Sequence, residues 1–234
     1  MTTGHMTENT SSVRSSARGT RNALRPQTER KRARIVDVAM RLFAEQGYHD
    51  ARVGDIAAEL GIAKGSIFQH FGSKEALFLE VYKKATRSFA AYLDVPSEVR
   101  EGGFFEILRY WLVHTEHMVR EDWIPYRVQL LGNYGANLTL KREINRFLVA
   151  EDPFGRVAFV RFGLERSELR DDLDVETIVS FLDWVVERFQ DALLAEELDP
   201  GLFRRHGAAV ERKEARINQF LEVLRRAVGA DRPV

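Results

Sequence analysis

The sequence predicts an all-α protein with a small N-terminal domain and a larger C-terminal one. Apolar residues recur at helical spacing through most of the 234 residues, and no stretch beyond residue 95 shows the alternation of a half-buried strand. Glycine and proline interrupt this pattern at intervals that suit helix ends. We divide the chain into residues 1–27, a disordered basic arm, residues 28–73, the small domain, and residues 74–234, a linker helix with the larger domain.

The composition is that of an ordinary globular protein. Hydrophobic residues make up 44% of the chain, and 35 basic residues balance 35 acidic ones, so the bulk charge identifies no partner. The absence of cysteine excludes disulfides and thiolate metal ligands. No apolar run approaches the roughly 20 residues that cross a bilayer, and the N-terminus lacks the apolar segment of a signal peptide. We therefore predict a cytoplasmic protein without a membrane partner.

Basic residues are concentrated near the N-terminus. Residues 1–34 contain eight arginine or lysine side chains and only two acidic ones, Glu8 and Glu29. This excess could attract phosphates or could be a solvated tail, and the sequence leaves both possibilities open. Residues 1–27 have almost no apolar periodicity, so they cannot offset the entropy of ordering and should be disordered when free.

The small domain is predicted to contain three helices. The first begins after Thr28 and ends at Gly47, and its apolar residues recur on one face. The second covers residues 52–60 and the third residues 64–71, each followed by glycine. Because only residues 61–63 separate the second helix from the third, the pair predicts a helix-turn-helix.

The larger domain is predicted to be helical throughout. Ser73 caps the linker helix, and Asp174 caps a long helix further on. The last two helices are the longest and have the clearest apolar stripes. The expected helices after the linker cover residues 103–120, 125–134, 139–149, 155–167, 175–197 and 203–228.

Residues 53–78 read VGDIAAELGIAKGSIFQHFGSKEALF, and this run resembles the signature of the tetracycline-repressor (TetR) family. The agreement includes I-A-x-x-x-G-I, a following helix that contains glycine, then H-F and S-K-E-x-L, without a gap. By motif the resemblance covers about residues 29–82. It implies a DNA-binding helix-turn-helix domain at residues 28–73 and a C-terminal effector-binding and dimerisation domain.

The third helix of the small domain is the predicted recognition helix. Its first residues, Lys64, Gly65 and Ser66, are small or polar enough for that end to enter the major groove. We expect Lys64 and Gln69 to contact bases, since glutamine can bond adenine in a bidentate manner and lysine can donate to guanine or phosphate. With phosphate contacts included, the predicted DNA-binding set is Arg52, Val53, Lys64, Gly65, Ser66, Phe68, Gln69, His70 and Lys74.

Three positions depart from the resembling family, which often has a hydroxyl residue where Ala51, Ala63 and Phe68 stand. An N-cap replaced by alanine typically costs about 1 kcal/mol. Asp50 could cap the second helix in place of residue 51, whereas the third helix lacks an obvious substitute. Phe68 cannot donate to a phosphate, so we expect affinity to depend more on charged groups and on salt.

In the resembling family the C-terminal domain binds a small molecule and dimerises through a four-helix bundle made from the last two helices of each subunit. The aromatic-rich segment 104–190 is the expected place for a pocket. Part of each apolar stripe could instead pack within one subunit. The predicted pocket residues are Tyr110, Trp111, His114, His117, Arg127, Gln129, Asn133, Phe162 and Trp184. The predicted dimer interface is Ile178, Leu182, Val185, Phe189, Ile217, Phe220, Leu221 and Leu224.

The sequence gives little indication of a metal site or of an enzyme active site. His114 and His117 stand three residues apart beside Glu116, a spacing that a metal site could use. Because clear third and fourth ligands are missing, we predict no metal, no cofactor and no catalytic residue. No P-loop, GxGxxG, HExxH or GxSxG string is present, and we predict that the protein is not an enzyme.

Together these observations predict a DNA-binding transcriptional repressor that a small-molecule effector releases from a palindromic operator. The predicted partners are a double-stranded DNA operator, a second copy of the chain in a homodimer, and an effector that the sequence does not identify. The alternative is a helix-turn-helix regulator controlled by a protein partner, with the C-terminal domain as a scaffold without a small-molecule pocket. An enclosed cavity would argue against this alternative.

Overall fold

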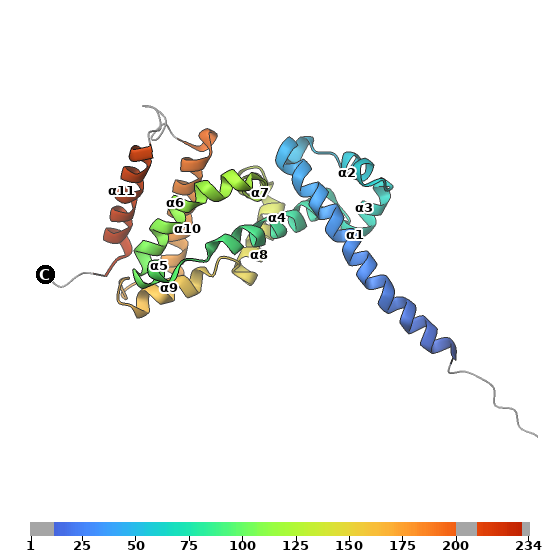
Figure 1. Cartoon of the computed structure of the whole chain (residues 1–234), viewed down its shortest axis with the longest axis horizontal. Helices are drawn as coiled ribbons and strands as arrows, with labels where there is room; N and C mark the ends of the chain where they lie inside the picture. The colour runs from blue at the N-terminus through green and yellow to red at the C-terminus, as the bar shows by residue number, and fades with distance from the viewer. Residues whose placement is uncertain (1–11, 200–209, 231–234) are drawn as a thin grey trace, which may run out of the picture. The chain divides into compact units, whose positions relative to one another are not determined.

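The computed structural model describes residues 12–199 and 210–230. These ranges fold as helices and turns, with an isolated β-bridge between Leu169 and Gly229, which confirms the all-α prediction. The helices, labelled in Figure 1, are α1 Ser12–Asp50, α2 Val53–Leu60, α3 Lys64–Phe71, α4 Lys74–Ala90, α5 Ser97–Glu101, α6 Phe104–Glu121, α7 Trp123–Tyr134, α8 Leu138–Glu151, α9 Arg156–Glu165, α10 Val175–Leu194 and α11 Val210–Val228.

Helix α1 starts earlier than the periodicity predicts. It begins at Ser12 and contains Pro26, whereas the apolar pattern begins only after Thr28. The residues before Pro26 lack the apolar face on which the prediction relied, so helical backbone there could not be foreseen from periodicity. Disorder of residues 1–27 in the free protein stays a prediction, and residues 1–11 lie outside the described ranges. At the other end, Gly47 adopts φ 83° and interrupts the helix where the sequence placed its end.

Two compact units make up the chain, residues 1–81 and residues 82–234, and their boundary falls within α4. The core of the first unit is aromatic. Phe43 of α1 and Phe78 of α4 are fully buried, and their rings meet edge to face with centroids 5.2 Å apart. Ile56 of α2 and Ile67 of α3 have nearly no exposure, and α2 packs against both α1 and α3.

The second unit packs α6 against α9 and α11, and α10 against α9. Its main core includes Phe104, Leu112, Ile178 and Leu224, which come from α6, α10 and α11. Phe189 of α10 stacks on Phe220 of α11 with ring centroids 3.9 Å apart. A smaller cluster around Tyr126 joins α4, α6 and α7.

Helix ends follow the predicted capping. The Ser73 hydroxyl accepts a hydrogen bond from the Ala76 N–H at 3.1 Å, and the Asp174 carboxylate accepts one from the Thr177 N–H at 2.7 Å. Helix α5 was not predicted, because five residues are too few to show a helical period. Residues 203–209 of the last predicted helix lie outside the described ranges.

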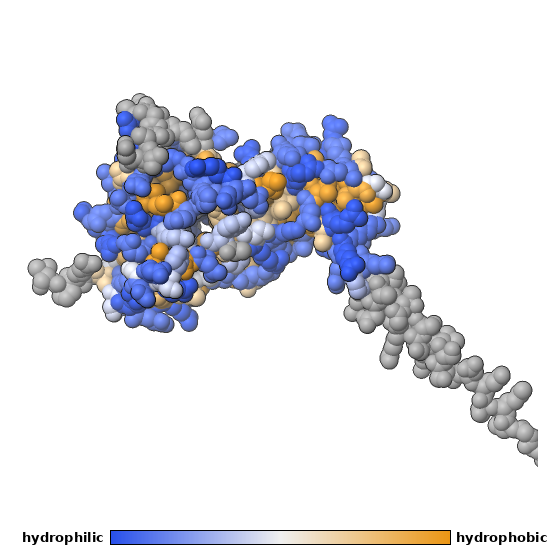
Figure 2. Space-filling view, viewed as in Figure 1, coloured by the Kyte–Doolittle hydropathy of each residue, from blue (hydrophilic) through white to orange (hydrophobic). Residues whose placement is uncertain are grey.

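The face seen in Figure 2 is largely hydrophilic, with apolar side chains in small patches. Among the described residues, no helix combines the length and the apolar character that crossing a membrane requires.

Candidate nucleic-acid interface and ligand cavity

Helix α3 has one buried side and one open side. Ile67 and Phe71 are 1% and 9% exposed and fix the helix to its own unit. Lys64, Gly65 and Gln69 are exposed, and Phe68 retains 38% of its surface. Both predicted base-reading residues are therefore exposed on α3.

The N-terminal ends of α2 and α3 lack side-chain caps. Ala63 is the N-cap of α3 and supplies no hydrogen bond, as the sequence indicated. For α2 the N-cap is Arg52, and no side chain accepts a bond there, so Asp50 does not act as the substitute cap. A Cβ added at Gly65 would meet no atom within 4 Å, so the backbone at the start of α3 is unobstructed.

His70 and the neighbouring basic residues form the second part of this surface. The Arg32 guanidinium donates to the His70 carbonyl oxygen and stacks over the Phe71 ring, 4.3 Å from its centroid. Burial, together with the charges of Lys31 and Arg32, lowers the pKa of His70, which favours a neutral imidazole at neutral pH. Sequence reasoning counted Arg32 only as part of a basic run and missed its place beside α3.

Two residues of the predicted DNA-binding set are less open than expected. The Lys74 ammonium donates to the His49 carbonyl oxygen at 3.1 Å and lies 4.9 Å from the centroid of the Tyr48 ring, and burial lowers its pKa. The Val53 side chain is 6% exposed and belongs to the core. Arg52, by contrast, is exposed, and Ser66 is half-buried.

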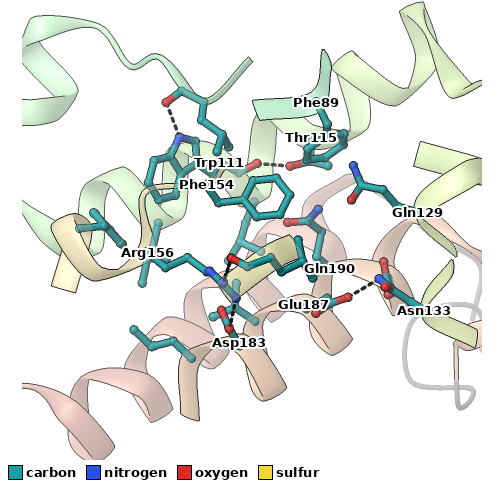
Figure 3. A pocket seen from close by; sticks show the side chains of 18 of the residues that line it. Phe89, Trp111, Thr115, Gln129, Asn133, Phe154, Arg156, Asp183, Glu187 and Gln190 are labelled. Carbon is teal, nitrogen blue, oxygen red and sulfur yellow. Dashed lines mark hydrogen bonds and ion pairs between the residues drawn. The ribbon is translucent and has the colours of Figure 1, made fainter. Parts of the chain in front are cut away.

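The second unit contains a cavity of about 200 Å³. Its wall comes from α4, α6, α7, α8, α9 and α10, and Figure 3 shows its labelled side chains converging from several of these helices. Three of the predicted pocket residues, Trp111, Gln129 and Asn133, line it. The wall also includes apolar and aromatic side chains, among them Phe89, Leu108, Tyr126, Phe154, Phe159 and Leu182.

The structure does not bring the other predicted pocket residues to the cavity. On α6 the lining positions are 108, 111, 112 and 115, one helical face, whereas Tyr110, His114 and His117 occupy another. The His114 ring stacks on Tyr110, and His117 lies 3.3 Å from the Glu121 carboxylate. The remaining residues outside the wall are Arg127, Phe162 and Trp184, the last of which is 74% exposed.

Helix α10 presents three carboxylates to the cavity, Asp183, Glu187 and Asp191. Residues four apart share one helix face, so the three form an acidic row. The Arg156 guanidinium of α9 pairs with Asp183. Sequence reasoning took α10 for an apolar stripe and missed both this row and Arg156. The acid–x₃–acid–x₃–acid spacing was the available signal.

The other two carboxylates of the acidic row have neutral partners. Asp191 accepts hydrogen bonds from the hydroxyls of Tyr126 at 2.9 Å and Tyr134 at 2.6 Å. Glu187 accepts one from the Asn133 amide. Glu187 is an exposed side chain that lines the cavity, and the surrounding protein raises the pKa of its carboxyl to about 7, chiefly through desolvation and then through repulsion by Asp191.

Most of the predicted dimer residues are buried within the subunit. Five of the eight are at most 7% exposed and belong to its core: Ile178, Leu182, Ile217, Leu221 and Leu224. Val185, Phe189 and Phe220 are half-buried. Among the described side chains of these two helices, the large apolar ones left open are Trp184 on α10 and Val223 on α11, which are 74% and 63% exposed.

Comparison with known proteins extends these observations. Residues 35–81 match the model of a family described as bacterial regulatory proteins, tetR family. The chain is 29% identical over 171 residues to the HTH-type transcriptional repressor AcnR of Corynebacterium glutamicum. This match covers 73% of this chain and 86% of AcnR.

Two solved structures share the fold. FadR from Bacillus subtilis, in complex with stearoyl-CoA, superposes with a TM-score of 0.60 at 22% identity, over 82% of this chain and 96% of that one. A transcriptional regulator from Saccharomonospora viridis, in complex with choline, superposes with a TM-score of 0.54 at 23% identity, over 87% of this chain and 100% of that one.

Proposed function

The chain belongs to the TetR family of transcriptional regulators, and on that premise we propose that it is a repressor which an effector in the C-terminal cavity releases from its operator. The observation that carries this proposal is the open polar side of α3. Lys64 and Gln69 are exposed there, on a helix whose opposite side is fixed in a core. Such a helix can enter the major groove without unfolding its own domain.

Each part of the DNA surface has its own role in this proposal. Gln69 reads adenine and Lys64 reads guanine or contacts phosphate. Arg52 and Ser66 contact phosphates and set the register. The Lys74 ammonium group already donates to the His49 carbonyl oxygen. Lys74 therefore contributes to phosphate binding mainly through its backbone N–H at the start of α4.

We also propose that the chain acts as a homodimer. Two recognition helices must reach half-sites about 34 Å apart or a multiple of this distance, which a symmetric dimer achieves. The exposed Trp184 and Val223 lie on α10 and α11, the two helices whose stripes the sequence assigned to dimerisation. A second copy of the chain would cover these side chains rather than the inward-facing Ile178 or Leu224.

The cavity is partly open rather than enclosed, and its converging wall of aromatic and polar side chains favours small-molecule control over the protein-partner alternative, since a scaffold needs no such lining. Helix α4 contributes Tyr82 and Phe89 to the cavity wall, and residues 74–81 of the same helix belong to the N-terminal unit. An effector that moves Tyr82 would therefore act on α4. It must bind the state that cannot bind DNA more tightly, or it shifts nothing.

The test is the affinity of the full chain for operator DNA. Operators are selected from a randomised duplex pool, and fluorescence anisotropy at two salt concentrations compares the wild type with the Lys64→Ala/Gln69→Ala double variant. Each bidentate base contact is worth about 1–3 kcal/mol, so the double variant should lose at least about 10-fold in operator affinity. Its affinity for random DNA should change less.

Gln46→Ala is the matched control, since Gln46 is also an exposed glutamine of the N-terminal unit but is not on α3. It should bind the operator like the wild type. Equal loss in the control and the double variant, or no selection of any sequence by the wild type, would overturn α3 as the reader of DNA.

A further inference from the structure

We propose that the effector is a small organic cation, held by Glu187 and surrounded by the aromatic wall of the cavity. This inference deepens the proposed function and rests on it, because it assigns a chemical class to the effector of the same cavity. It comes from the charge, the hydrogen bonds and the size of the cavity.

The charged groups of the wall are mostly acidic. Asp183, Glu187 and Asp191 of α10 line the cavity, and Arg156 is the basic residue among its lining side chains. Arg156 is already shared between two carboxylates, since its Nε lies 3.1 Å from Asp152 and its Nη1 pairs with Asp183. An anionic ligand would therefore meet net repulsion, whereas a cation would meet net attraction.

Within the acidic row, Glu187 combines a neutral hydrogen-bond partner with a single hydrogen bond within the described residues, so it keeps both its charge and room for further donors. Asp183 is paired with a guanidinium, and two tyrosine hydroxyls bond Asp191. Glu187 accepts from the Asn133 amide, whereas an ionised carboxylate can accept about four hydrogen bonds.

The hydrogen bonds of Asn133 fix the orientation of its amide. Its Oδ1 accepts from the Tyr82 hydroxyl at 3.2 Å and from the Lys141 ammonium at 3.4 Å, so its Nδ2 points to Glu187. The Lys141 ammonium is thereby engaged with the amide oxygen. Figure 3 shows Glu187 and Gln190 together on α10, with the Asn133 amide at the Glu187 end.

The rest of the wall suits the apolar part of a cation. Phe89, Trp111, Tyr126, Phe154 and Phe159 line the cavity, and aromatic faces attract ammonium groups. The Trp111 indole N–H donates to the Leu93 carbonyl oxygen at 2.9 Å, which holds the ring in place. A volume of about 200 Å³ lies below the roughly 300–1,000 Å³ of pockets for drug-sized ligands, so the cation should be compact.

Binding should strengthen as pH rises through neutrality. The cation binds the ionised form of Glu187, and the pKa of this carboxyl is about 7. The charged groups that act on Glu187 are Asp191 and Asp183 from its own helix, Arg156 from α9 and Lys141 from α8. Tyr82, Tyr126 and Tyr134 also lie in this network, and burial raises the pKa of each phenol.

The test is isothermal titration of the full chain with tetramethylammonium, choline and benzyltrimethylammonium, each beside its neutral carbon isostere, and with octanoate as an anion. We expect at least one cation to bind 10-fold or more tightly than its isostere at pH 8, and more weakly at pH 6. Glu187→Gln keeps the shape of the side chain and removes its charge, so the ratio of the cation's affinity to that of its isostere should fall to about 1.

The matched control is Glu176→Gln, which removes an exposed carboxylate from the first turn of the same helix and should keep the preference. Thermal unfolding of both variants establishes that they fold. The proposal is overturned if no cation exceeds its isostere, if the preference survives in Glu187→Gln, or if octanoate binds more tightly than every cation. Operator binding by the same samples separates the two proposals. If the protein binds its operator but shows no preference for cations, only the proposed effector class is overturned. If it shows no selective DNA binding, the proposed repressor function is overturned.

Discussion

Helices α3 and α10 present polar side chains to ligands in opposite ways. On α3 these side chains are exposed, and Lys64 and Gln69 leave hydrogen-bonding groups that water satisfies until DNA replaces it. On α10 the acidic row faces a cavity, where Asp183 and Asp191 require partners from other helices. On our two proposals, one all-helical fold holds a site for a polyanion and a site for a cation, because local charge and access to water decide the ligand.

The largest expected effect is a loss of stability, and it tests whether α10 packs one side in the core of the subunit and leaves the other side free for a second copy of the chain. Ile178→Ala empties a fully buried position and should lower the free energy of unfolding by about 2–5 kcal/mol. Trp184→Asp changes a residue that is 74% exposed, and should weaken dimerisation while the subunit remains folded. Urea unfolding and sedimentation equilibrium measure the two effects. A stable Ile178→Ala protein that is monomeric would instead place Ile178 in the dimer interface.

A second pair of variants compares glycines in the two units. A Cβ at Gly132 would lie 2.4 Å from the Tyr82 ring, so Gly132→Ala should overpack the second unit and destabilise it by about 1–3 kcal/mol. At Gly65 a Cβ meets nothing, and alanine should stabilise α3 by about 0.5–1 kcal/mol yet weaken operator binding. Thermal unfolding and anisotropy measure these changes. Undiminished operator affinity in Gly65→Ala would contradict a close approach of the α3 backbone to DNA.

Restoring a capping side chain at the start of α3 should change the stability of the N-terminal unit by a smaller amount, in a direction that can be predicted. Ala63 has the extended backbone of an N-cap, with φ −68° and ψ 138°, but no side chain that accepts a hydrogen bond. Ala63→Ser should therefore stabilise the N-terminal unit by about 1 kcal/mol. Ser73→Ala should cost a similar amount, because the Ser73 hydroxyl caps α4. Calorimetric unfolding of both variants checks the pair, and equal signs would contradict the capping account.

The smallest expected effect is the pH dependence that the acidic row imposes. The pKa of Glu187 is raised in the folded protein to about 7, so between pH 4.5 and 7 the folded state holds more protons than the unfolded state. Stability should then fall as pH rises through this window. Solvent in the cavity screens the charge, so we expect less than about 1 kcal/mol. Melting curves from pH 4.5 to 8 should show a flatter profile for Glu187→Gln, and a steeper one would contradict the raised pKa of this carboxyl.

The sequence predicted the helices and their caps better than the residues that line the cavity, for a physical reason. Periodicity and capping residues such as Ser73 and Asp174 act locally, and both predicted caps are present. Lys64 and Gln69 could be placed because a continuous motif sets the register of α3.

A cavity depends on how separate helices rotate toward one another, which periodicity does not determine. Trp111 lines the cavity, whereas His114 lies on another face of α6 and Trp184 is exposed and outside the wall. Ile178 and Leu224 show the same difficulty, since an apolar stripe has the same pattern whether it packs within a subunit or between two.

The most direct test of the whole account is the operator affinity of the full chain in the presence of the tightest-binding cation of the titration series. The account predicts that saturating cation weakens operator binding by 10-fold or more in the wild type and leaves it unchanged in Glu187→Gln. Reciprocally, bound operator should weaken cation binding by the same factor. If the cation occupies the wild-type cavity and operator affinity stays the same, control of DNA binding through this cavity is contradicted.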